Sequence, residues 1–182
     1  MAGATLDRCV IDNADLASID FGALTMTHVD FRACIFRDSD MAGMDLRGHD
    51  FSCCTFNRAR MTEVNLAGCR LDMANFQETL LQKANLSGAN AKAAFFGEAI
   101  CHLANFEGAM LRMATFSKAD VSGANFKGVD LRESVLDHLK AHYTVFASAS
   151  LHWADLSHSD LEGADMSAAN LFWANLHNVK DD

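Results

Sequence analysis

Histidines are the residues of this chain whose type and spacing come closest to a site for chemistry. His138 and His158 lie twenty residues apart, with His142 and His152 between them, and grouped imidazoles are typical zinc ligands. No cysteine or carboxylate stands at a ligand-like spacing from them, so we interpret these histidines as surface residues. The sequence therefore predicts no metal site and no cofactor.

The elements that must position these side chains follow a five-residue period. Every fifth residue from Leu6 to Leu176 is apolar. Only three of these centres are not Leu, Ile, Val, Met or Phe, namely Ala91, Cys101 and Ala141. A small residue stands two positions before most centres, Asp or Asn usually stands one before, and Gly often stands two after. Self-similarity at a fixed period is the signature of a repeat architecture.

Neither a single helix nor a flat sheet can use this period. Five residues advance an α-helix by about 500°, so the apolar centres would scatter around the whole cylinder. On a strand, side chains alternate between the two faces, so an odd period sends successive centres to opposite sides. The chain must therefore turn once per repeat, so that each centre points into a closed, apolar coil.

The clearest copies of the repeat are Ala84–Gly88, Ala104–Gly108 and Ala124–Gly128. They resemble the pentapeptide-repeat family, whose motif is a small residue, Asp or Asn, Leu or Phe, and two variable residues. The resemblance covers essentially the whole chain. It implies an all-β fold, a right-handed quadrilateral parallel β-helix with four repeats per coil and about nine coils, in one domain over residues 1–182.

In such a solenoid, residues twenty apart stack on each other. One interior column then carries five successive rings, Phe36, Phe56, Phe76, Phe96 and Phe116. The facing column supplies Phe106, Phe126 and Phe146. Bulk thus passes from one wall to the other, which keeps a narrow core at constant packing density. Near Ala91 and Cys101 the small side chains leave three alternatives: a small void, an inward shift of the wall, or filling by Phe95.

Cysteines and glycines fit the same scheme as structural residues. Only Cys53 is expected to face outward, and the inward cysteines are Cys9, Cys34, Cys54, Cys69 and Cys101. Stacking would bring Cys34 and Cys54 within reach of a disulfide, but nothing indicates an oxidising compartment, so we favour free thiols. One column of glycines is interpreted as turn residues rather than a phosphate cradle: Gly48, Gly68, Gly88, Gly108 and Gly128.

Composition limits the function classes further. The chain has 50% hydrophobic residues and no proline, so it can bury a sizeable core. No apolar run approaches the ~20 residues that span a bilayer, and no basic and apolar leader is visible, so we expect a cytoplasmic protein. A filled solenoid offers flat faces rather than a concave pocket, so we expect no enzyme.

The resemblance also implies a candidate function. Some family members, including the quinolone-resistance proteins, are acidic rods that bind DNA gyrase or topoisomerase IV in place of DNA. The net charge here is -9, whereas duplex DNA as long as nine coils, about 43 Å, carries about 25 charges. Eleven acidic residues are Asp directly before a centre, where the motif itself wants Asp or Asn: Asp15, Asp20, Asp30, Asp40, Asp45, Asp50, Asp120, Asp130, Asp155, Asp160 and Asp165.

The sequence therefore favours a protein-interaction or scaffold module with an unidentified protein partner. The alternative is the DNA mimic, although neither the protruding loop nor the carboxy-terminal helix common in the quinolone-resistance group is visible. Direct nucleic-acid binding is not expected, because phosphate contacts need clustered Lys and Arg.

Partner contacts are expected near the carboxy terminus, where aromatic side chains should be exposed. Trp153 and Trp173 stack two residues after their centres, with Phe172 adjacent and Tyr143 on the neighbouring face. No recognisable cap follows Leu176, and an open solenoid end exposes core and strand edges. We therefore predict a homodimer around the carboxy-terminal coil. A second apolar patch in the middle of the rod is interpreted as partly buried corners: Leu80, Phe95, Ile100, Leu103 and Met110.

Overall fold

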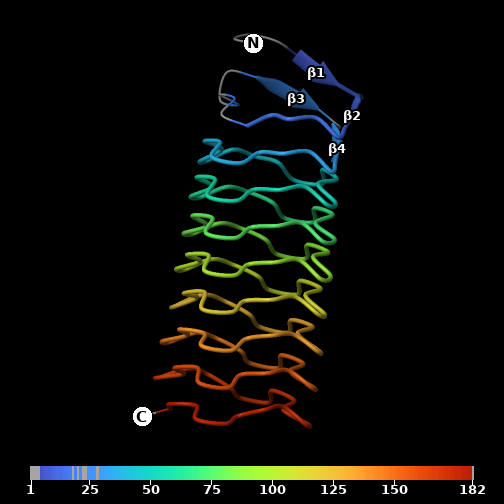
Figure 1. The fold of residues 1–182 in the computed structure, drawn as a ribbon. Helices are drawn as coiled ribbons and strands as arrows, with labels where there is room; N and C mark the ends of the chain where they lie inside the picture. The colour runs from blue at the N-terminus through green and yellow to red at the C-terminus, as the bar shows by residue number, and fades with distance from the viewer. Residues whose placement is uncertain (1–4, 18, 20, 22–23, 28, 182) are drawn as a thin grey trace.

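The computed structural model describes residues 5–17, 19, 21, 24–27 and 29–181 and forms one continuous stack of coils, a right-handed parallel β-helix (Figure 1). Four short strands open it: β1 (Thr5–Asp7), β2 (Val10–Asp12), β3 (Thr25–Thr27) and β4 (Asp30–Arg32). β1 pairs in parallel with β3, and β2 with β4, each with a partner twenty residues on. The predicted fold is confirmed.

Beyond β4, each side of a coil contributes a single bridging residue. Asn85 pairs in parallel with Asn105, and Asn105 in turn with Asn125. The same step of twenty continues to the bridge between Asp160 and Lys180. Four five-residue sides therefore make one coil. In the described part of the chain there is no helix that is both long and apolar enough to cross a membrane.

The core is the line of repeat centres. Parallel rings stack with centroids 4.9 Å apart from Phe36 through Phe56 and Phe76 to Phe96, and 4.5 Å apart between Phe96 and Phe116. On the facing wall, centroids lie 4.5 Å apart between Phe106 and Phe126 and 5.2 Å apart between Phe126 and Phe146. All eight rings are at most 1% exposed. The large rings change from one wall of the core to the other at Phe96 and Phe106, which pack edge to face with ring centroids 5.9 Å apart.

Asp or Asn before the centre has a structural role that explains much of the acidity. Its side-chain oxygen accepts the backbone N–H two residues on, as in the 3.1 Å contact between Asn85 Oδ1 and Ser87 N. Nine of the eleven aspartates at this position make the bond: Asp15, Asp40, Asp45, Asp50, Asp120, Asp130, Asp155, Asp160 and Asp165. Asp20 lies outside the described residues.

At each described corner, the residue two positions after the centre lies in the left-handed region. A hydrogen bond closes the turn one residue later, as from Ala89 N to Leu86 O at 3.1 Å. Gly88 has φ +62°, and the non-glycine Lys83 has φ +56°. No Val, Ile, Thr or Pro occupies this position anywhere from Arg8 to Asn178, because a β-branched side chain is strongly disfavoured at positive φ.

Gly88→Val is expected to lower the free energy of unfolding by about 1–2 kcal/mol, the cost of a left-handed residue with a Cβ. No atom lies within 4 Å of the place a Cβ would take, so the loss measures backbone strain alone. Gly88→Asn should cost much less, because Asn tolerates this region. Urea denaturation of both variants checks this, and equal stability of the two would contradict it.

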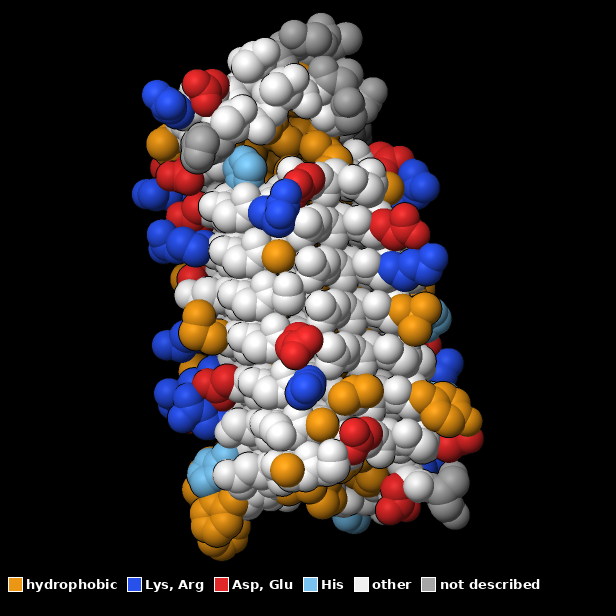
Figure 2. All heavy atoms as spheres, turned by 180° about the vertical axis from the view of Figure 1, so that it is seen from behind, with side chains coloured by type: hydrophobic (Ala, Val, Ile, Leu, Met, Phe, Trp, Pro, Cys, Tyr) orange, Lys and Arg blue, Asp and Glu red, His pale blue; other side chains and the backbone are white. Residues whose placement is uncertain are grey.

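The ladder opens near the amino terminus, which departs from the regular stack that the period predicts. Among the described residues, no bridge joins Thr25 to Asp45, and a hollow of about 480 Å³ lies between their coils. Figure 2 shows hydrophobic side chains within this opening. Leu24 and Met44 stand at the inward position that alanine usually occupies, and both line the hollow.

Phe95 does not fill the core. Its side chain is 36% exposed, and its ring lies outside, over Gly97, where a Cβ would come within 2.6 Å of the ring. Ala91 and Cys101 are both fully buried nearby. All six cysteines are free, and of these only Cys53 is exposed. Burial raises the pKa of the Cys54 thiol to about 12 and that of Cys69 to about 11.

Candidate functional site

Four aromatic side chains stack at one corner of two adjacent coils, and we call them the aromatic corner: His152, Trp153, Phe172 and Trp173. Ring centroids lie 5.6 Å apart between Trp153 and Trp173 and 4.9 Å apart between His152 and Phe172. Trp153, Phe172 and Trp173 are 56%, 58% and 66% exposed. Because these residues stand twenty apart at equivalent positions, the backbone ladder fixes their spacing.

An apolar hollow adjoins the aromatic corner, and we call it the apolar end. It measures about 360 Å³ and is lined chiefly by Leu161, Met166, Leu171, Leu176 and Val179. Leu176 is 46% exposed, whereas Leu156, twenty residues earlier in the same column, is fully buried. The last coil thus presents to solvent the same side chains that the coils above it bury.

Backbone groups of this coil are also unpaired. In the interior, a centre N–H donates to the coil that follows, as Leu156 N does to Asn175 O at 2.9 Å. The N–H groups of Met166, Leu171 and Leu176 have no acceptor among the described residues, and the carbonyls of Ala164 and Ala169 have no donor. The apolar end therefore offers both halves of a β-ladder.

Tyr143 does not join this surface. It is 67% exposed, and its ring lies over Gly163, where a Cβ would come within 2.6 Å of the ring. Ten residues separate Tyr143 from Trp153, which is half a coil, so the two stand at opposite corners rather than on neighbouring faces. The sequence-based grouping of Tyr143 with the tryptophans is wrong for this reason.

The mid-rod patch consists of separate corner contacts. Leu103 covers Gly123, where a Cβ would meet the Leu103 side chain at 2.8 Å, much as Phe95 covers Gly97. Leu103 and Met110 are 60% and 50% exposed, while Leu80 and Ile100 are only partly exposed. Phe95 and Leu103 thus each shield a glycine, Phe95 in its own coil and Leu103 in the next.

Charged side chains pair between coils along the rod. Arg58 donates to Asp38 at 2.9 Å and Arg60 to Asp40 at 2.6 Å. Hydrogen bonding from Arg58 lowers the pKa of Asp38. Figure 2 shows blue and red side chains interleaved along both edges of one face, whose middle is mostly white, the colour of the backbone and of side chains that are neither charged nor hydrophobic.

Asp120 belongs to one of these groups of charged side chains. Burial on its own raises the pKa of this carboxyl, but hydrogen bonds from Ser122, His102 and Lys140 outweigh it and hold the pKa well below its usual range. Lys140 Nζ lies 3.1 Å from Asp120, and His102 Nε2 lies 2.8 Å away.

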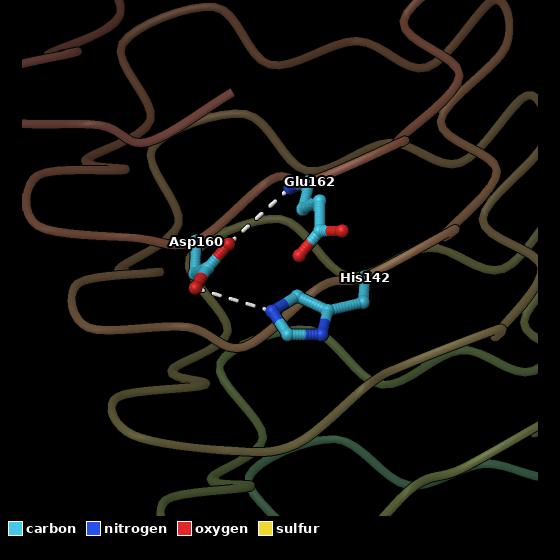
Figure 3. Close-up of side chains that lie close together, drawn as sticks. All are labelled: His142, Asp160 and Glu162. Atoms are coloured by element: carbon cyan, nitrogen blue, oxygen red, sulfur yellow. Dashed lines mark hydrogen bonds and ion pairs between the residues drawn. The ribbon is translucent and has the colours of Figure 1, made fainter. Parts of the chain in front are cut away.

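His142 has two carboxylates near it, contrary to the prediction from the sequence. Ligand atoms of His142, Asp160 and Glu162 lie within 4.8 Å of one another (Figure 3). The carboxylates stand 18 and 20 residues further on, in the next coil, so no local motif announces them. His138 and His158 stack on each other at 4.9 Å instead.

The repeat, read along the sequence, matches a family model described as pentapeptide repeats, in eight copies over residues 25–62, 59–97, 99–137 and 145–180. This chain belongs to the pentapeptide-repeat family. A comparison with curated protein sequences gives no significant match.

Solved pentapeptide-repeat structures share the fold. HetL, involved in heterocyst differentiation regulation in the cyanobacterium Nostoc sp. strain PCC 7120, is 25% identical with a TM-score of 0.61, over 98% of this chain and 87% of HetL. QnrB1, a plasmid-mediated fluoroquinolone resistance protein, matches in two trypsin-treated variant forms. One form is 20% identical with a TM-score of 0.57, over 99% of this chain and 92% of its own. The other is 22% identical with a TM-score of 0.58, over 97% and 91%.

Proposed function

We propose that this pentapeptide-repeat protein is a non-catalytic protein-interaction module that forms a homodimer through the aromatic corner and the apolar end. The observation that carries the proposal is the aromatic corner itself, three large rings more than half exposed on a rigid frame. Exposed Trp and Phe beside an apolar hollow have the composition of interface hot spots.

A second copy is the partner that fits the apolar end best. Its edge carries N–H donors at Met166 and Leu171 and carbonyl acceptors at Ala164 and Ala169. A copy related by a twofold axis presents the same groups in reverse order, so donors meet acceptors, and an isologous contact closes as a dimer. The hollow would then be filled by the partner's equivalent side chains.

A non-catalytic role is supported by the interior and by the thiols. The rings from Phe36 to Phe146 fill the core, and burial raises the pKa values of Cys54 and Cys69 far above neutral pH, which keeps these thiols protonated and poorly nucleophilic. Sedimentation equilibrium of the purified chain tests the dimer. We expect the mass of two chains, and a single-chain mass at every concentration would refute the proposal.

Mimicry of DNA towards gyrase or topoisomerase IV is the second candidate, favoured by the fold shared with QnrB1 over nearly the whole chain. Interleaved ion pairs such as Arg58 with Asp38 weaken it, because they break up a continuous anionic surface. A supercoiling assay decides between the candidates. Inhibition of gyrase, or relief of quinolone poisoning, would favour mimicry. The absence of both effects would favour the protein-interaction module.

A further inference from the structure

His142, Asp160 and Glu162 converge on the outside of two adjacent coils (Figure 3). Nε2 of His142 lies 3.1 Å from Oδ2 of Asp160, and Glu162 N donates to Oδ1 of Asp160 at 3.3 Å, which orients that carboxylate. The His142 and Asp160 side chains are 26% and 35% exposed, so the group is half-sheltered with one side open to water.

The spacing suits a metal ion. Imidazole nitrogen and carboxylate oxygen bind Zn²⁺ at about 2.0–2.2 Å, so two such atoms 3.1 Å apart subtend an angle of about 95° at a shared ion. That angle lies between octahedral and tetrahedral values. His142 Nε2 is shielded from solvent and faces Asp160 Oδ2. A metal ion would take the place of the proton that the imidazole and the carboxylate can share, because both ligands bind a metal in their deprotonated forms.

A related pair two coils earlier shows what distinguishes this cluster. His102 Nε2, equally shielded, lies 2.8 Å from Asp120, but Lys140 binds the same carboxylate at 3.1 Å. The residue that corresponds to Glu162 there is Ser122. The earlier group therefore carries its own cation.

Around Asp160 the balance is reversed. In the described part of the chain, no lysine or arginine lies within ion-pair distance of Asp160, and Glu162 adds a second negative charge. Lys180, the counterpart of Lys140, acts on Asp160 only through the longer-range charge interaction. The group of His142 therefore lacks a cation such as Lys140, which the group of His102 has. It offers three ligand atoms around the place that a cation would take.

We propose that His142, Asp160 and Glu162 bind one divalent transition-metal ion, with Zn²⁺ the best match to one nitrogen and two carboxylate ligands and water completing the coordination. The ion would tie the coil of His142 to the coil of Glu162. This proposal does not use the proposed dimer as a premise. The ligands stand half a coil away from the aromatic corner, but Glu162 lies between Leu161 and Gly163, which line the apolar end.

Isothermal titration of the full chain with Zn²⁺ tests the site. Cys53→Ser serves as the background for every variant, because Cys53 is an exposed thiol and thiols are zinc ligands in their own right. We expect one ion per chain, and an affinity at least ~10-fold lower in His142→Ala and in Glu162→Gln. His102→Ala is the matched control and should bind as the parent does. All the altered side chains lie on the surface, and circular dichroism verifies that each variant is folded.

Two results would overturn the proposal. One is a parent protein that shows no saturable binding of Zn²⁺. The other is unchanged affinity for Zn²⁺ in both His142→Ala and Glu162→Gln. If His158→Ala then abolishes binding, the stacked pair of His138 and His158 is the site instead.

Discussion

Phe96→Ala is expected to lower the free energy of unfolding by about 3–5 kcal/mol, the usual cost of deleting a buried ring. Phe96 is fully buried and stacks between Phe76 at 4.9 Å and Phe116 at 4.5 Å. The neighbouring centres on its coil, Ala91 and Cys101, are small, so they cannot fill the void.

Backbone hydrogen bonds to the coils above and below also oppose collapse, as from Phe96 N to Thr115 O at 2.7 Å. Phe95→Ala is the matched control. It deletes the same kind of ring at the preceding residue, which is partly exposed, so it should lower the free energy of unfolding by no more than about 1 kcal/mol. Denaturation followed by circular dichroism measures both. Equal losses in the two variants would show that the ring ladder is not the main source of stability.

Trp173→Asp is expected to weaken the proposed dimer by about 30-fold or more, because truncating a hot-spot side chain costs at least about 2 kcal/mol and a charge would face an apolar partner. Trp173 is 66% exposed in the single chain, so the monomer should keep its fold and stability. Sedimentation velocity over a concentration series gives the dissociation constant.

Leu103→Asp is the matched control for this experiment. Leu103 occupies the same left-handed turn position as Trp173, with φ +57° against +60°, and is 60% exposed. It lies far from the aromatic corner along the rod, so the dimer should be unaffected. A similar effect of both substitutions would indicate general loss of solubility rather than a local interface.

The period of the sequence predicts most of the fold because one backbone geometry repeats at every corner. Once residues twenty apart are known to stack, the ring columns from Phe36 to Phe146 follow from the sequence. The period does not predict the opening of the amino-terminal ladder. Leu24 and Met44 line this opening, but Leu139 is buried at the same inward position where the ladder is closed.

The candidate sites were less predictable, because they depend on contacts between coils and around corners. Tyr143 is close to Trp153 in the sequence, but ten residues are half a turn of the solenoid. His142 has no carboxylate near it along the chain, but Asp160 and Glu162 approach it from the next coil. A search for carboxylates between 18 and 22 residues after each histidine would have found that cluster.

Amide hydrogen exchange measured as a function of protein concentration tests the proposed interface most directly. The amides of the last coil that have no hydrogen-bond acceptor among the described residues include Met166, Ala168, Leu171, Trp173, Leu176 and Asn178. We predict that they exchange rapidly at low concentration and become protected as the dimer forms, while amides in the middle of the rod do not change. Exchange rates independent of concentration, or protection that appears only at β1 and β2, would contradict a dimer built on the apolar end.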